Sequence, residues 1–152
     1  MSPTSSVAGV LVSLKPEFAA AVAEGRKTVE LRRRFPLVDA GVWLVIYVTK
    51  PIGAVVGMSP IQEVRRTAVT AIWNDHRENA AISRARFCDY FDDRVRGFAV
   101  LLGSYEPVRP IAADRLAVIL PGFQPPQSWR YLNANVLAAI RGRAEPGPAR
   151  LR

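Results

Sequence analysis

The chain has 152 residues, enough for one domain and too few for two enzymatic ones, and its 49% hydrophobic and 22% charged residues are typical of a globular protein. Its longest apolar run, residues 42–48, is far shorter than the roughly 20 residues of a membrane-spanning helix, and its first residues lack the basic start of a secretory signal, so we expect a cytoplasmic protein without membrane contact. The 21 basic residues outnumber the 13 acidic ones, and all but three are arginines, which suits polyanionic partners such as nucleic acids.

The single cysteine, Cys88, excludes an internal disulfide, and the single histidine, His76, disfavours most zinc sites and any two-histidine iron site. We therefore predict neither a metal nor another cofactor. A GC-rich genome favours arginine over lysine in every protein and would give the same basic count. Only clustering of the cations therefore indicates a binding function.

The first predicted element is a short helix that starts at Pro16. Proline suits the first helical position, Glu17 favours the positive end of the helix dipole, and Gly25 supplies the stop. Phe18 and Val22 lie four residues apart, on one face of this helix.

A basic strand follows, because residues 26–34 hold five cations and one carboxylate, Glu30. The period of two places its polar side chains on one face, those of Thr28, Glu30, Arg32 and Arg34, and Val29, Leu31 and Phe35 on the other. A carboxylate framed by arginines can orient their guanidinium groups toward a ligand. The alternative is a solvated strand face with surface ion pairs of little consequence.

Residues 42–49 are rich in β-forming side chains and predict a strand covered on both faces, with Tyr47 and Lys50 near its end. Residues 54–64 predict a second strand whose glycine marks a bulge. Residues 67–73 predict a short helix.

Residues 74–79 are polar and predict a turn. His76 lies in it and is more simply a solvated loop histidine than a general acid or base, because no second histidine or serine motif accompanies it.

Residues 83–91 predict a helix with an aromatic stripe of Phe87, Tyr90 and Phe91, which favours core packing over base stacking. Cys88 lies beside the stripe, and we expect it to be a buried packing residue rather than a nucleophile.

Residues 97–104 predict a further strand, residues 106–110 and 121–127 proline-rich turns, and residues 133–141 a terminal helix. These elements predict a small mixed barrel, since no glycine-rich phosphate-binding motif is present. We expect a flexible start at residues 1–8, one domain at residues 9–142 and a basic mobile tail at residues 143–152.

The segment GRKTVELR contains the pattern Gly-x-Lys-x-x-Glu-x-Arg, formed by Gly25, Lys27, Glu30 and Arg32. This pattern, its place after a first helix, and the later GFAVLLGSYEPVRPI and PPQSWRYL segments resemble the ASCH domain of the PUA-like superfamily, in its longer bacterial stand-alone form. The resemblance covers roughly residues 9–132.

The resemblance implies an α+β fold, a mixed or antiparallel β-pseudobarrel flanked by helices, with a cleft that binds RNA or a modified nucleotide. It brings the basic strand, the strand end at Tyr47 and Lys50, and Ser128 to that cleft. The predicted nucleic-acid-binding residues are Lys27, Arg32, Arg33, Arg34, Lys50, Trp129 and Arg130.

Some members of the family resemble hydrolases, either ribonucleases or amidohydrolases acting on acylated cytidine. The small amidohydrolase members carry a threonine where this chain has Glu30, which speaks against that deacylation. For an enzyme, the catalytic candidates are Lys27, Glu30, Tyr47, Lys50 and Ser128.

Three hypotheses remain from the sequence. The leading one is a binding module for RNA or another single-stranded nucleic acid, and the second is a metal-independent hydrolase of RNA or of a modified nucleoside. The third is a protein-interaction or transcriptional coregulator module. The protein partner is unknown, and both a monomer and a homodimer fit the sequence.

Overall fold

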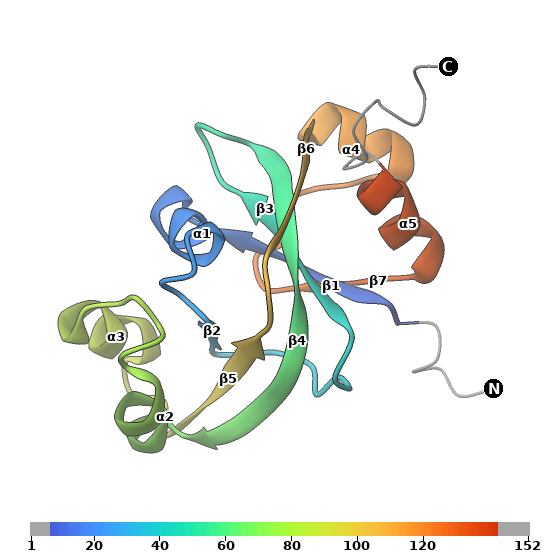
Figure 1. The fold of residues 1–152 in the computed structure, drawn as a ribbon. Coiled ribbons are helices and arrows are strands. Elements are labelled where there is room, and N and C mark those ends of the chain that lie inside the picture. Colours follow the sequence, from blue (N-terminus) through green and yellow to red (C-terminus); the bar gives the residue numbers. More distant parts are fainter. Residues whose placement is uncertain (1–6, 143–152) are drawn as a thin grey trace.

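The computed structural model describes residues 7–142, which form seven strands and five helices (Figure 1). In chain order these are β1 (Gly9–Leu14), α1 (Pro16–Ala23), β2 (Val29–Arg32), β3 (Trp43–Val48), β4 (Ala54–Ala68), α2 (Val69–His76), α3 (Arg84–Phe91), β5 (Arg96–Leu102), β6 (Glu106–Ala112), α4 (Ala113–Ile119), β7 (Arg130–Leu132) and α5 (Ala134–Gly142).

The strands form one mixed sheet in the order β2-β5-β4-β3-β1-β7, with β6 paired to β4. Strands β1 and β3 are parallel, and the other pairs are antiparallel. The long β4 pairs with β3 and β6 through its first half and with β5 through its second. The predicted α+β class is confirmed, and the sheet is not closed, since β2 and β7 are not neighbours in it.

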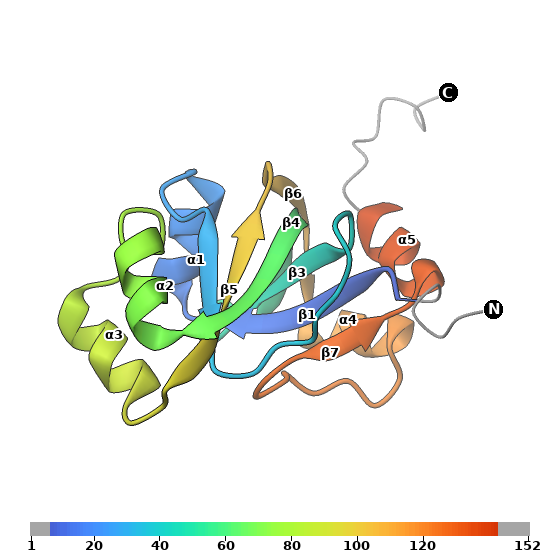
Figure 2. The same ribbon diagram turned by 90° about the horizontal axis from the view of Figure 1, so that it is seen from below.

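The helices gather at two ends of the sheet, α1, α2 and α3 at one and α4 and α5 at the other (Figures 1 and 2). Alternate side chains of β3 serve different cores: Leu44 and Ile46 pack with α1, whereas Val45 and Tyr47 pack with α4 and α5. A third core joins α2 and α3 to β2 and β5. Both faces of β3 are therefore covered, as its apolar run predicts.

The first helix and the central strands agree with their predictions. Pro16 occupies the start of α1, and Gly25 follows its end at φ 81°, a conformation that glycine adopts without strain. Strand β4 carries a register shift beside Gly57, the glycine expected to mark a bulge.

The turn predicted at residues 106–110 is wrong, because these residues belong to β6. Among residues 7–142 this strand pairs with β4 alone, and its prolines, Pro107 and Pro110, are tolerated because an edge strand does not need every N–H in a ladder.

Two predictions for single residues are also wrong. His76 is not in a solvated loop but is the last residue of α2, and it is buried because it shares the inner face of the helix with Ile72 four residues earlier. Cys88 is exposed, because α3 buries Phe87 and Phe91 on one face and the residue after Phe87 turns about 100° away from it.

The predicted tail at residues 143–152 lies outside the described residues, as do residues 1–6 of the predicted flexible start. Within residues 7–142, none of the helices has the length and apolar character needed to cross a membrane.

Candidate functional site

The turn after α1 places Lys27 just before β2, the strand at one edge of the sheet. The backbone N–H groups of Arg26 and Lys27 both donate to the carbonyl of Ala21, at 2.9 and 3.0 Å. The N–H groups of Thr28 and Val29 donate to the carbonyl of Asn79, at 2.8 and 3.0 Å. The start of β2 is thus fixed between α1 and the turn that joins α2 to α3.

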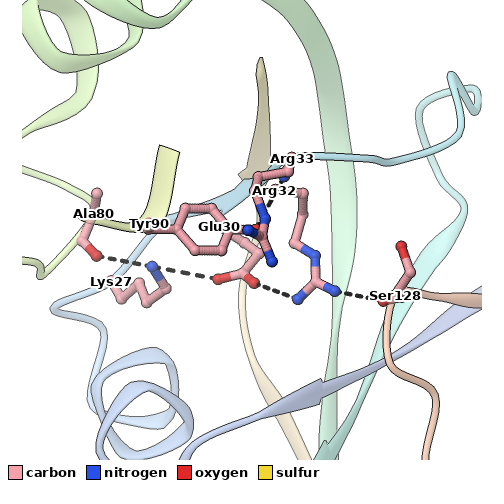
Figure 3. Close-up of polar contacts among 7 residues, drawn as sticks. All are labelled: Lys27, Glu30, Arg32, Arg33, Ala80, Tyr90 and Ser128. Carbon is pink, nitrogen blue, oxygen red and sulfur yellow. Dashed lines mark hydrogen bonds and ion pairs between the residues drawn. The ribbon is translucent and has the colours of Figure 1, made fainter. Parts of the chain in front are cut away.

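A buried ionic cluster, formed by Lys27, Glu30 and Arg32, occupies this position (Figure 3). The Lys27 Nζ lies 3.3 Å from one oxygen of Glu30 and donates to the carbonyl of Ala80 at 2.8 Å. The Arg32 Nη1 donates to the other oxygen of Glu30 at 3.1 Å, and its Nη2 donates to the carbonyl of Ser128. Lys27 and Glu30 are each only 4% exposed.

The buried ionic cluster holds two cations and one carboxylate, so it carries a net charge of +1. Both oxygens of Glu30 are already occupied, which makes this carboxylate an orienting group for the two cations. Lys27 has three N–H donors and Arg32 five, so both keep donors beyond the contacts described above. A buried positive charge with spare donors attracts an anion or a polar ligand.

A cavity of about 440 Å³ opens beside the buried ionic cluster. Its volume lies in the range of small-molecule sites, roughly 300 to 1,000 Å³. It is lined by Ser13, Leu14, Lys15, Phe18, Lys27, Glu30, Leu31, Arg32, Ile82, Arg86, Asp89 and Tyr90. Four of these side chains are cations and two are carboxylates, so the lining is positive overall.

Aromatic rings hold cations in the cavity and next to it. Phe18 has the Lys27 Nζ 5.3 Å and the Arg86 guanidinium carbon 4.9 Å from its ring centroid. Tyr90 carries the Arg33 guanidinium 4.9 Å from its centroid, and its hydroxyl accepts a hydrogen bond from the backbone N–H of Arg33 at 3.0 Å. Such cation–π contacts restrict where a long, flexible cation can point.

The structure brings together the hallmark residues and Ser128, whereas Tyr47 packs elsewhere. Its ring lies 5.4 Å from that of Phe123, in the core formed with α4 and α5. Leu14 and Phe18, which line the cavity, belong to the core on the other face of the sheet.

Lys50 is exposed in the turn after β3. Strands β1 and β3 are parallel neighbours that end at the same edge. Lys15 follows β1 there, and Lys50 follows β3. Lys15 is among the lining residues of the cavity, and Lys50 is not.

The remaining predicted binding residues follow Arg32 or Ser128 in the sequence. Arg33 and Arg34 are exposed just after β2. Trp129 is half-buried, with its ring 4.8 Å from that of Tyr131, and Arg130 is half-buried in β7.

The lining residues that the sequence interpretation missed include Lys15, Phe18, Arg86 and Asp89. The spacing of Phe18 and Val22 predicted a helix face but not its place at a cavity. Arg86 and Asp89 lie on a helix more than fifty residues away from the hallmark, so no local pattern connects them to it. Among residues 7–142, no three histidine, cysteine, aspartate or glutamate side chains gather in a way that could hold a metal ion.

Comparisons of this chain with known protein families, sequences and structures agree on one family. The ASCH domain model matches residues 12–126. An ASCH domain-containing ribonuclease of Zymomonas mobilis is 40% identical over 124 residues, which cover 80% of this chain and 82% of that protein. The crystal structure of ASCH from Zymomonas mobilis has a TM-score of 0.86 and 34% identity, and the match covers 91% of this chain and 96% of that one. Structures of two variants, one with a tyrosine replaced by phenylalanine and one with a serine replaced by alanine, match equally well.

Proposed function

We propose that this chain, which belongs to the ASCH domain family, binds single-stranded RNA with one nucleotide in the cavity beside the buried ionic cluster. The single observation that carries the proposal is the net positive charge of Lys27, Glu30 and Arg32 at the wall of that cavity. Such a charge, with donors to spare, suits a phosphate oxygen or an acceptor on a base edge.

Two further features support RNA over a small uncharged ligand. The chain carries a formal net charge of +8, and Arg33 and Arg34 extend the positive surface from the cavity onto the exposed end of β2. The relative that is 40% identical is named a ribonuclease. A strand of RNA that leaves the cavity would meet these cations through its phosphates.

The test is binding of short labelled single-stranded RNA and DNA, with EDTA present, at two salt concentrations. Lys27→Met keeps the length of the side chain and leaves Glu30 paired with Arg32, so we expect a folded variant with weakened, less salt-dependent binding. Arg65→Ala removes one cation from an exposed pair outside the cavity and is the matched control. Equal affinities of wild type and Lys27→Met would contradict the proposal.

A second candidate function is metal-independent cleavage of the bound RNA, favoured by the ribonuclease relative. In this reaction the 2′-oxygen attacks phosphorus, the bond from phosphorus to the 5′-oxygen breaks, and a 2′,3′-cyclic phosphate forms. A base takes the proton of the 2′-hydroxyl, and an acid gives a proton to the leaving 5′-oxygen. Lys27 and Arg32 would stabilise the charge that develops on the phosphate.

The sequence offers three candidates for the proton-transfer groups, and of these we propose Ser128 first, because Tyr47 packs on the other face of the sheet and Lys50 does not line the cavity. Ser128 is linked to the buried ionic cluster through its backbone carbonyl. The two variant structures of the relative replace a tyrosine and a serine, which are the residue types of Tyr47 and Ser128. Cleavage of RNA in EDTA that is lost in Ser128→Ala, Lys50→Ala or Tyr47→Phe, while binding persists, would support it. RNA that stays intact, or cleavage of RNA with 2′-O-methyl riboses, would refute it.

A further inference from the structure

A second group of charges lies at the mouth of the same cavity, on residues outside the family hallmark. Arg86 of α3 donates from Nη1 to Glu17 Oε2 of α1 at 2.6 Å, and Lys15 is the exposed residue before that helix. The hydrogen bond from Arg86 lowers the pKa of Glu17, and the charge of Lys15 contributes in the same direction. One carboxylate thus stands between two cations, as in the buried ionic cluster.

The two groups differ in their exposure to water. The buried ionic cluster is fixed, whereas the Arg86 and Glu17 side chains are 43% and 58% exposed. An exposed ion pair contributes little to stability because water screens it, so a stronger anion can displace its carboxylate at little cost. Glu17 is therefore a replaceable partner of Arg86.

Arg86 is held in place without Glu17. Its guanidinium carbon lies 4.9 Å from the ring centroid of Phe18, and both residues line the cavity. A stacked guanidinium keeps its edges free for paired hydrogen bonds to a phosphate. Asp89, on the same helix, also lines the cavity, and its carboxylate would repel an anion here. The two cations Arg86 and Lys15 outweigh this one negative charge.

We propose that Arg86 is a phosphate-binding residue at the mouth of the cavity, and that Glu17 occupies it in the free protein and gives way to a phosphate of the bound RNA. This inference rests on the proposed function and adds to it a specific contact and an internal competitor. In this arrangement Lys27 and Arg32 bind the nucleotide at the floor of the cavity, and Arg86 binds a backbone phosphate at its mouth. Removing the competitor and removing the arginine should then change affinity in opposite directions.

The experiment measures affinity for a short single-stranded RNA with 2′-O-methyl riboses, beside the unmodified RNA, by fluorescence anisotropy in EDTA at several salt concentrations. Arg86→Ala should weaken binding roughly tenfold or more, the effect of losing a hydrogen-bonded charge, and lower the salt slope by about 0.7. Glu17→Gln should strengthen binding roughly 1.4- to 5-fold. In the Arg86→Ala background Glu17→Gln should have no such effect.

The matched controls are Arg65→Ala and Glu63→Gln, which alter an exposed pair of similar exposure whose Nε and Oε2 atoms lie 2.9 Å apart, away from the cavity. Thermal unfolding checks that each variant folds, and Arg86→Lys, which keeps the charge but not the planar fork, should recover only part of the affinity. Equal effects of the Arg86 and Arg65 variants would overturn the inference while binding through Lys27 stands. Absence of RNA binding by the wild type would instead reject the proposed function and this inference with it.

Discussion

Replacement of Glu30 by glutamine tests whether the buried ionic cluster is held by its one carboxylate. One oxygen of Glu30 forms an ion pair with the Lys27 Nζ at 3.3 Å, and the other accepts from Arg32 at 3.1 Å. Glutamine keeps the volume but offers one carbonyl oxygen and turns an NH₂ group toward the other cation. Two cations then face each other, buried, without a counter-charge.

The expected loss is that of breaking a buried pair, about 3 to 5 kcal/mol. Against a typical free energy of unfolding of roughly 5 to 15 kcal/mol, this is a large fraction. For a chain of this size about 2 to 4 °C of melting temperature corresponds to 1 kcal/mol, so the midpoint should fall by roughly 6 to 20 °C.

The assay is urea unfolding followed by circular dichroism, with thermal unfolding beside it. Glu63→Gln is the control, because its carboxylate forms an exposed pair with Arg65 that contributes little to stability. If Glu30→Gln lowered the free energy of unfolding no more than this control, the buried ionic cluster would not stabilise the fold in the way described.

Two further predictions concern the core behind β2 and β5. Burial, with a smaller contribution from Arg65, lowers the pKa of His76 below its ordinary value of 6.5, so the unfolded state binds the proton more readily and the free energy of unfolding should fall as the pH drops below 6.5. In His76→Gln this fall should disappear from urea titrations between pH 7 and 5; an unchanged slope would refute the assignment. Gly97→Ala would place a Cβ 2.4 Å from a ring carbon of buried Phe91 and should cost about 1 to 3 kcal/mol in urea unfolding. Gly142→Ala, whose Cβ would meet no atom of residues 7–142 within 4 Å, should show no such loss, and equal effects would contradict the packing argument.

Local patterns in the sequence were sufficient for the central elements. The apolar run before Lys50 predicted β3, and the glycine at position 25 predicted the end of α1, because burial on both faces and a positive φ each leave a local mark. The alternation of residues 28–32 placed Glu30 on one face with Arg32, and the two side chains form an ion pair, whereas the contact of Glu30 with Lys27 was not part of that face. It left open whether that face is solvated, because alternation carries no information on what covers a strand.

The sequence could not assign β7, which has only three residues, or recognise β6 behind its two prolines. Edge strands tolerate residues that are typical of turns, so composition and structure disagree there. The same limit applies to His76, whose burial depends on the sheet beneath α2 rather than on its polar neighbours.

The sequence by itself determined the family hallmark, the basic character and the α+β class of this protein. Only the tertiary structure decided that Lys27, Glu30 and Arg32 form a buried cluster, that Ser128 joins it through its backbone carbonyl, and that Arg86 lines the cavity. The physical reason is distance along the chain. Residues that share a strand or a helix reveal their common face by periodicity, whereas contacts between distant segments depend on how the sheet and helices pack.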